Sequence, residues 1–410
     1  MGCELHALTL LLEHRPLPVI APPLPSLTGK TILQVVPEMA TGGVERTTLE
    51  VASAIIAAGG RAVVFSHGGR LVSELEALGA RHIQGPAASK NPWTVFVTNP
   101  LRLIKLIQQE QTDLVHARSR APAWSAWIAA RWTKTPFVTT YHGIYNAKSG
   151  LKRWYNSVMA RGDIVIANSG FTKDHVIDEH KTPADRLEVI YRGVDVEAFI
   201  PKAVTTARRK ALAKSWDIPV KSARPRLILP ARLTAWKGQR VLLEALSILL
   251  KKGIELDCLM VGDAQGRDAY LDDLKAQVER LQLGSYVHFV GHCSDMPAAF
   301  ALSDIAITPS IEPEAFGRTA AEAQAMGLPV IASDLGGARE TVDPGVTGLL
   351  CQPGDAQALA SAIEKLLALS PEERKAMGTA GQARVQQKFT TLALQRATLL
   401  VYHNLVQARS

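Results

Sequence analysis

The chain has 410 residues, of which 47% are hydrophobic and 20% are charged, and its formal net charge is +8. This length favours two domains that each bury a core, and the balance of residue types excludes a disordered, collagen-like or coiled-coil chain. The four cysteines are scattered and form no CxxC pair, which indicates neither a disulfide framework nor a zinc site and fits a reducing cytoplasm.

The first predicted domain follows a proline-rich lead-in over residues 1–28 and spans residues 29–200. Short β-rich runs alternate there with longer segments of helical period. The runs are TILQVV, RAVVFS, DLVHAR, PFVTTYH, DIVIANS and LEVIYRG. Apolar strands separated by helices predict βαβ units and a parallel sheet that is covered on both faces.

A strongly basic segment lies within this domain. Between Arg61 and Arg153 the chain has thirteen Lys or Arg residues against four Asp or Glu residues. Such a patch suits an anionic partner, although a simple solvated basic face is the alternative. Tryptophans within and beside it favour a membrane surface, and no nucleic-acid motif accompanies it. We therefore expect an anionic membrane surface as a partner and no nucleic acid.

The second predicted domain begins after the alternation breaks at Val194. The basic, polar stretch 196–225 is interpreted as the interdomain connection. The alternation resumes with RLILPAR, ELDCLMVG, VHFVG, DIAITPS, PVIASD and GLLCQP, which predicts a second doubly wound domain over residues 201–385. From Ser370 onward the pattern is helical only. The amphipathic segment within residues 386–410 must therefore pack against a core that is already built.

Candidate site residues in the first domain follow its strands, because ligands of open parallel sheets bind at the carboxyl ends of the strands. Gly42 and Gly43 follow the first strand and open a helix, where the backbone can approach an anion or a sugar. His142 follows PFVTTY and can hydrogen-bond a ligand or move a proton. An ordinary loop glycine and an ordinary loop histidine are the structural alternatives.

Candidate site residues in the second domain suit a sugar nucleotide. Arg232 ends a strand and Lys237 comes five residues later, a fork and a point charge that suit a diphosphate. In EPEAFGRTAAEAQAMGLPVIAS, Glu314 lies in a loop and Glu322 lies eight positions on, inside a helix. Each carboxylate can accept hydrogen bonds from sugar hydroxyls. The start of that helix can face a phosphate, through Phe316, Gly317, Arg318 and Thr319.

The same stretch resembles the E-x7-E signature of the retaining glycosyltransferases of family four, which have the GT-B fold. GGVE after the first strand, His142-Gly143, Arg232 with Lys237, and GLPVIASDLGGARETV agree with that family in order, over about residues 31 to 390. VIYRGVD stands where the family usually has a Pro-Asn-Gly turn. HARSRAPAW and PFVTTYHGIYN also resemble lipopolysaccharide-core transferases of proteobacteria, including mannosyltransferases.

This resemblance implies an α/β protein with two Rossmann-like domains that face a cleft, and a final helix that crosses back to the first domain. The first domain would bind the acceptor and the second the donor. The implied activity transfers a hexose of the mannose or glucose type, with retention, from a GDP- or UDP-linked sugar. The implied acceptor is a lipid-linked, membrane-associated glycan, expected to be lipopolysaccharide core, at the cytoplasmic face of the inner membrane.

The resemblance also implies roles for single residues. Glu314 would hold hydroxyls of the donor sugar and Glu322 the ribose. The expected catalytic residues are Glu314, His142, Arg232 and Lys237, and the expected donor-binding residues are Gly43, Arg232, Lys237, Glu314, Phe316, Gly317, Arg318, Thr319 and Glu322.

No Asp-x-Asp motif occurs in the chain, so we expect no metal ion and no cofactor besides the nucleotide sugar. Arg232 and Lys237 would stabilise the departing diphosphate instead. No second carboxylate is placed as a nucleophile, which favours departure of the diphosphate from the face that the acceptor attacks. Two alternatives stay open: a sugar-nucleotide 2-epimerase of the same fold, and a non-catalytic subunit of a polysaccharide-synthesis complex.

Overall fold

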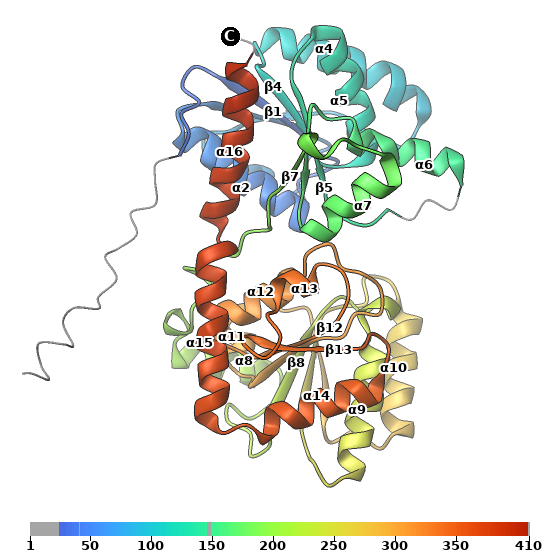
Figure 1. Ribbon diagram of the computed structural model, residues 1–410, viewed down its shortest axis with the longest axis vertical. Coiled ribbons are helices and arrows are strands. Elements are labelled where there is room, and N and C mark those ends of the chain that lie inside the picture. Colours follow the sequence, from blue (N-terminus) through green and yellow to red (C-terminus); the bar gives the residue numbers. More distant parts are fainter. Residues whose placement is uncertain (1–23, 41, 146–148, 409–410) are drawn as a thin grey trace, which may run out of the picture.

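The computed structural model describes residues 24–40, 42–145 and 149–408. They form two α/β domains, the first at the top and the second at the bottom of Figure 1. Of the predicted lead-in, residues 1–23 lie outside the described residues. Leu27, also assigned to the lead-in, is 1% exposed and packs in the first domain's core.

The first domain contains a seven-stranded parallel sheet in the order β3-β2-β1-β4-β5-β6-β7. Its strands are β1 (Thr31–Val35), β2 (Arg61–Ser66), β3 (Arg81–Gln84), β4 (Leu114–Ala117), β5 (Phe137–Tyr141), β6 (Ile164–Ala167) and β7 (Leu187–Val189). Its helices are α2 (Gly43–Ala57), α3 (Val72–Ala77), α4 (Asn99–Gln109), α5 (Arg120–Thr133), α6 (Gly150–Asn156) and α7 (Gly170–His180), with short turns η1 (Thr94–Thr98), η2 (Ser157–Ala160) and η3 (Ala184–Arg186).

Helices cover both faces of this sheet, which explains why β1 and β5 are buried along their whole length. Successive side chains of a strand point to opposite faces. Accordingly Leu33 packs in the core beneath α4 and α5, whereas its neighbour Ile32 packs in the core beneath α2. The continuous apolar runs in the sequence are therefore those of a strand covered on both faces.

The second domain contains a six-stranded parallel sheet in the order β10-β9-β8-β11-β12-β13. Its strands are β8 (Arg226–Pro230), β9 (Asp257–Val261), β10 (Val287–Gly291), β11 (Ile305–Thr308), β12 (Val330–Ser333) and β13 (Gly348–Cys351). Its helices are α8 (Thr206–Ser215), α9 (Gln239–Lys251), α10 (Asp268–Arg280), α11 (Met296–Phe300), α12 (Arg318–Ala325), α13 (Ala338–Thr341), α14 (Ala356–Ala368) and α15 (Pro371–Lys388), with turns η4 (Pro201–Ala203) and η5 (Ala235–Lys237).

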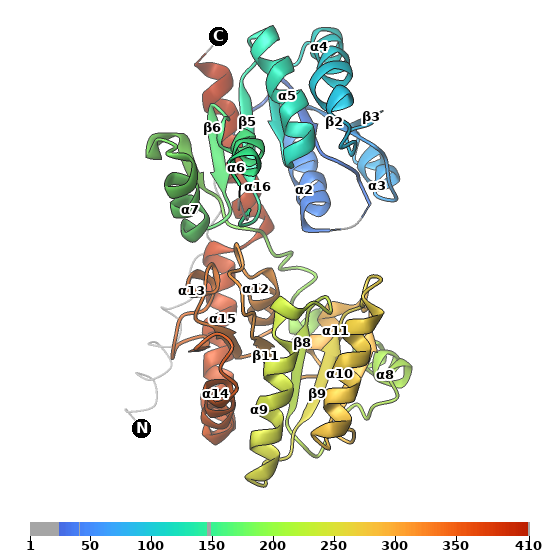
Figure 2. The same cartoon turned by 90° about the vertical axis from the view of Figure 1, so that its right-hand side faces the viewer.

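The last helix, α16 (Thr391–Gln407), leaves the second domain and packs on the first, as predicted. It lies beside α2 in Figure 1, and Figure 2 shows α15 and α16 as one column along both domains. Leu394, Leu399 and Tyr402 enter the same core as Ile32. Beside the joint, the Val194 amide donates to the Phe389 carbonyl at 2.7 Å, and the Thr391 amide donates to the Val194 carbonyl at 3.0 Å.

Two parts of the fold differ from the prediction. Strand β3 was not predicted, because it is a short edge strand whose Arg81 and Gln84 are exposed and which therefore shows no apolar run. The stretch 196–225, predicted as the interdomain connection, contains α8, and Ala213 of this helix is buried in the second domain's core. Its polar composition reflects a helix with one narrow buried face.

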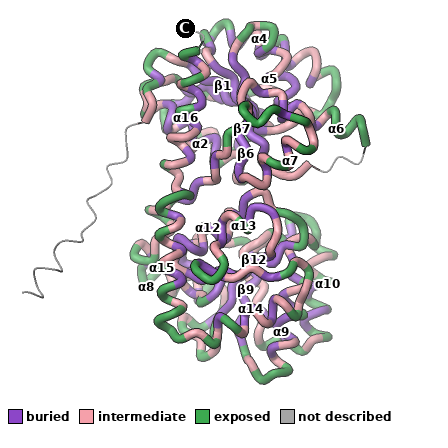
Figure 3. The backbone as a smooth tube through the Cα atoms, viewed as in Figure 1, coloured by how far each residue is buried: buried purple, intermediate pink, exposed green. Residues whose placement is uncertain are grey.

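Burial along the backbone follows this organisation: the strands are mostly buried, and the helices around them alternate buried, intermediate and exposed residues (Figure 3). Within the described residues, no helix is both long enough and apolar enough to span a lipid bilayer.

Candidate functional site

A pocket of about 480 Å³ lies between the two domains. Its first-domain residues follow β1, β5, β6 and β7, and its second-domain residues follow β8 and β11, so the carboxyl ends of both sheets meet there. The lining residues are Gly43, His142, Gly143, Ile144, Asn168, Arg192, Arg232, Trp236, Glu312, Pro313, Glu314, Ala315, Phe316, Gly317 and Arg318. This is the place where parallel α/β sheets bind ligands.

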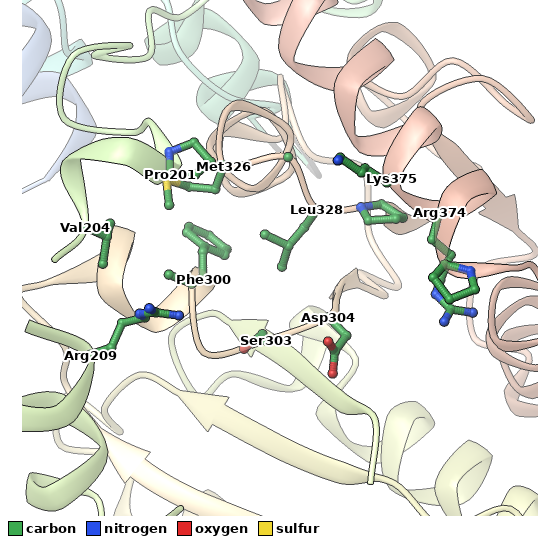
Figure 4. A pocket seen from close by; sticks show the side chains of 14 residues that line it. Pro201, Val204, Arg209, Phe300, Ser303, Asp304, Met326, Leu328, Arg374 and Lys375 are labelled. Carbon is green, nitrogen blue, oxygen red and sulfur yellow. The ribbon is translucent and has the colours of Figure 1, made fainter. Parts of the chain in front are cut away.

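A slightly larger hollow of about 540 Å³ lies elsewhere in the second domain (Figure 4). Its Ser303 and Asp304 precede β11, and Leu328 and Pro329 precede β12, so it adjoins the amino ends of these strands. Because parallel strands present their carboxyl ends to a ligand, the interdomain pocket is the stronger candidate site despite its smaller volume.

Glu314 and Lys237, predicted to contact different parts of a donor, touch each other. The Lys237 ammonium lies 2.7 Å from Glu314 Oε1, which also accepts a hydrogen bond from the Ser310 hydroxyl at 2.5 Å. Among the described residues, Glu314 Oε2 accepts no hydrogen bond. The pair therefore offers one free carboxylate oxygen beside a cation.

The backbone on either side holds this pair in place. The Gly337 amide donates to the Glu314 carbonyl at 2.8 Å, and a Cβ at Gly336 would come within 2.5 Å of that same carbonyl oxygen. At Gly238, after Lys237, a Cβ would come within 1.9 Å of the Pro309 carbonyl oxygen. Both glycines have positive φ, so the close approach of these loops requires glycine at both positions.

Arg232 and Arg318 are the second-domain cations that line the pocket, whereas Lys237 is not a lining residue and adjoins it through its contact with Glu314. Arg232 is exposed, and within the described residues its guanidinium makes no ion pair or hydrogen bond. Arg318 Nε lies 2.8 Å from Glu322 Oε1, one turn further along α12. Burial raises the pKa of the Glu322 carboxyl, and Arg318 opposes this shift. Arg232 is thus the cation that is free for a ligand, whereas Arg318 is already paired.

The side chains of three further predicted donor-binding residues contact other residues of the protein. Glu322 does not line the pocket, because its carboxylate lies behind Arg318. The Thr319 hydroxyl is directed to the Pro230 carbonyl at 3.5 Å. The Phe316 ring is 3% exposed and packs against Phe389, with ring centroids 5.4 Å apart. Of the residues predicted around the start of α12, Phe316, Gly317 and Arg318 therefore border the pocket, whereas Thr319 and Glu322 do not.

Arg192 was not among the predicted site residues, yet it joins the two predicted residues of the first domain. Its Nη1 donates to the Gly43 carbonyl at 2.7 Å and to the Thr47 hydroxyl at 2.6 Å, and its Nη2 lies 2.9 Å from His142 Nδ1. Burial and the nearby guanidinium of Arg318 lower the pKa of Arg192 to about 10, which leaves it charged at neutral pH. The sequence did contain one indication of a role for Arg192: in VIYRGVD it stands where the resembled family usually has the Asn of a Pro-Asn-Gly turn.

His142 lines the pocket, and its other ring nitrogen, Nε2, is buried without a hydrogen-bond partner among the described residues. Burial, followed by the positive charges of Arg192 and Arg118, holds the pKa of His142 well below its usual range. The imidazole is therefore neutral at physiological pH.

Pocket residues that the sequence did not single out include Asn168, Trp236 and Glu312. Glu312 lies two residues before Glu314, and the structure places both beside the pocket. Asn168 follows β6 and donates from its amide to the His142 carbonyl at 3.3 Å. Its position after a strand was the signal that could have found it.

The two domains also touch directly beside the pocket. The Glu340 carboxylate of α13 accepts hydrogen bonds from the amides of Gly170 and Phe171 at 2.8 Å each, and from the Tyr191 hydroxyl at 3.0 Å. A second-domain carboxylate thus caps the amino end of α7 in the first domain, where the helix dipole favours negative charge.

Comparisons with known proteins agree with this arrangement. A family model described as "Glycosyltransferase Family 4" matches residues 41–198, and one described as "Glycosyl transferases group 1" matches residues 213–384. The crystal structure of a glycosyltransferase from Rickettsia africae is 38% identical, with a TM-score of 0.84, over 92% of this chain and 99% of that one.

Two further matches have names that mention a donor. The Anabaena protein HepE, crystallised in complex with UDP-glucose, is 25% identical with a TM-score of 0.76, over 89% of this chain and 97% of that one. A GDP-mannose-dependent phosphatidylinositol monomannoside mannosyltransferase of Mycolicibacterium smegmatis is 28% identical over 72% of this chain and 78% of its own length.

Two facing Rossmann-like domains with a returning final helix define a glycosyltransferase of the GT-B fold, which confirms the predicted fold class. The chain belongs to glycosyltransferase family four.

Proposed function

We propose that the protein transfers a hexose of the glucose or mannose type, with retention of configuration, from a UDP- or GDP-linked sugar to a membrane-associated glycan. The observation that supports this most directly is the Lys237–Glu314 pair beside the unpaired Arg232. A carboxylate suits sugar hydroxyls and two cations suit a diphosphate. The donors named for HepE and for the mannosyltransferase support the two nucleotide classes.

In this proposal two cationic side chains stabilise the departing diphosphate in place of a metal ion. As the bond to the anomeric carbon breaks, negative charge grows on the diphosphate, and Arg232 and Lys237 stabilise it. Lys237 then exchanges its contact with Glu314 for a phosphate oxygen, and Glu314 orients the sugar. No second carboxylate is assigned as a nucleophile, so the diphosphate leaves from the face on which the acceptor attacks.

The acceptor is proposed to be lipid-linked, with lipopolysaccharide core as the acceptor class that the sequence resemblance favours. The first domain exposes five large apolar side chains on or beside η1, α4, α5 and α6: Trp93, Leu101, Trp132, Leu151 and Trp154. The same helices carry the basic residues Arg102, Lys105, Arg131 and Lys152. Apolar side chains among cations suit the surface of an anionic membrane, which supports peripheral attachment at its cytoplasmic face.

The transfer is tested by incubating the purified protein with labelled UDP- and GDP-linked glucose and mannose, and with a membrane lipid extract. We expect label to enter the lipid fraction, with the anomeric configuration of the donor preserved in the product by NMR. EDTA should leave the rate largely intact. Conversion of the donor to its 2-epimer would identify the epimerase instead, and a donor that stays unchanged would favour the non-catalytic subunit.

Membrane attachment is tested separately with lipid vesicles. We expect binding to anionic vesicles that salt reverses, because screening shortens the reach of each charge. A Trp132→Ser, Leu151→Ser double variant should bind less, whereas Leu400→Ser, which changes an exposed leucine of α16, should bind as wild type does. If binding is absent, or if salt does not change it, the basic segment between Arg61 and Arg153 is a solvated face without a membrane partner.

A further inference from the structure

The contact between Arg192 and His142 determines which imidazole nitrogen holds the proton. Every guanidinium nitrogen of a charged arginine is a donor, and arginine has no acceptor. The partner of Arg192 Nη2 at 2.9 Å, His142 Nδ1, must therefore accept. An accepting Nδ1 has no hydrogen, so the neutral ring has its single hydrogen on Nε2.

The remaining nitrogen is the unusual part of this arrangement. His142 Nε2 is shielded from solvent and has no partner among the described residues, although the side chain lines the pocket. A buried polar atom without a partner is rare in native proteins and needs an explanation. Because His142 is a lining residue of the pocket, a ligand oxygen that reaches Nε2 would complete this donor.

Arg192 is itself held firmly enough to impose this choice. Its Nη1 is fixed by the Gly43 carbonyl and the Thr47 hydroxyl, both in the first two turns of α2. The guanidinium thus joins three segments of the first domain: the end of β7, the start of α2 and the loop after β5. The other tautomer, with its hydrogen on Nδ1, would place two donors against each other, which costs the hydrogen bond.

We propose that Arg192 is a positioning residue that locks His142 with its proton on Nε2, so that His142 serves the transfer as a hydrogen-bond donor to a substrate oxygen and not as a proton acceptor. The role of His142 towards a substrate rests on the proposed function, whereas the position of its proton does not. The other groups facing His142 are Arg118 and His116 from the β4 segment and Tyr145 from the loop after β5. None of them is a carboxylate that would favour a charged ring.

The state of the ring is tested by long-range ¹H–¹⁵N NMR on the full chain labelled with ¹⁵N-histidine, with His142→Gln to assign the signal. We expect a neutral ring with hydrogen on Nε2 and none on Nδ1. In Arg192→Met the two tautomers should mix and the ring should take up a proton at higher pH, and Arg192→Lys, which keeps a donor, should restore the wild-type spectrum. A wild-type ring with hydrogen on Nδ1, or an Arg192→Met spectrum like that of wild type, would overturn the proposal.

The role of the ring is tested by turnover of two variants that leave Arg192 in place. The side-chain amide of His142→Gln can donate but cannot take up a proton, and His142→Leu can do neither. We expect His142→Gln to be at least about tenfold more active than His142→Leu, a factor that corresponds to one neutral hydrogen bond. Equal activities would show that donation from this side chain does not affect turnover and would overturn the donor role. If wild type shows no transfer, the proposed function fails while the NMR result still decides the tautomer.

Discussion

At the scale of single residues, the two glutamates of the E-x7-E stretch differ in what they touch. Glu314 borders the pocket and has a free oxygen, whereas Glu322 lies behind Arg318 and neutralises it. Glu314 can therefore act on the reacting sugar directly. Glu322 acts on the pocket at least partly through the position of Arg318.

Glu314→Gln should lower kcat and leave nucleoside diphosphate binding intact, because orientation of the sugar matters most as the bond breaks. Glu322→Gln should mainly raise the donor KM, because the contacts that it supports are alike in the ground and transition states. Isothermal calorimetry with the free nucleoside diphosphate, beside turnover, separates the two effects. Loss of nucleotide binding in Glu314→Gln alone would show that the two roles are assigned in the wrong order.

Arg232→Ala and Lys237→Ala should each slow turnover, by about 10²–10³, because a contact to a departing anion contributes about 2–4 kcal/mol in the transition state. Arg240→Ala is the matched control, since Arg240 belongs to the same domain and forms an exposed ion pair with Asp273. It should leave turnover unchanged. Wild-type turnover in both Arg232→Ala and Lys237→Ala would show that the diphosphate site is wrongly assigned.

How far the site could be predicted also depends on single residues. His142, Arg232 and Lys237 each follow a strand, and position after a strand can be inferred from the sequence alone. The role of Arg192 could not, because its partner Gly43 lies 149 positions away and only the folded chain brings them together. The contact of Lys237 with Glu314, 77 positions apart, was hidden for the same reason.

At the scale of secondary-structure elements, apolar runs identified twelve strands correctly, and the edge strand β3 escaped because an exposed edge lacks such a run. Helix α8 escaped because only one narrow face of it is buried. Helix α16 could be predicted from the sequence, since an amphipathic helix with no following strand must pack on a core. Its position depends on Tyr402, which is fully buried.

The hydroxyl of Tyr402 lies 2.5 Å from His116 Nδ1, whose Nε2 lies 2.7 Å from the Thr140 hydroxyl. Tyr402→Phe keeps the packing and leaves the buried His116 nitrogen unsatisfied, which should lower the free energy of unfolding by about 1–3 kcal/mol. Urea denaturation measures this change. Tyr286→Phe, which removes a hydroxyl from an exposed contact with Glu255, should change stability little; an equal loss in both would refute a special role for Tyr402.

At the scale of the whole molecule, Glu340 links the domains beside the pocket through its three hydrogen bonds to the first domain. Hydrogen bonds to a charged group contribute about 1.5–3 kcal/mol each, so this contact favours the arrangement in which the domains touch. Elsewhere the chain crosses twice between the domains, at Val194 and at Thr390, and these crossings pair with each other.

Glu340→Ala should therefore shift the ligand-free protein towards wider separation of its domains. Small-angle X-ray scattering should show a larger radius of gyration than in wild type. Glu364→Ala, which removes an exposed ion pair with Lys252 within the second domain, is the control and should scatter as wild type does. If Glu340→Ala scatters like wild type, the Glu340 contact is not needed to keep the domains in this arrangement.

The return of α16 to the first domain has a consequence for synthesis of the chain. The ribosome makes residues 31–189, with all seven strands of the first sheet, long before it makes Leu394, Leu399 and Tyr402, which complete that domain's core. At about 5–20 residues per second, the gap lasts roughly 10 to 40 seconds. During that time the apolar residues that pack with α16, including Leu114 of β4, lack this cover in the nascent chain. The first domain therefore becomes complete only after the second has emerged, and a chaperone that shields these residues must stay bound until α16 has emerged.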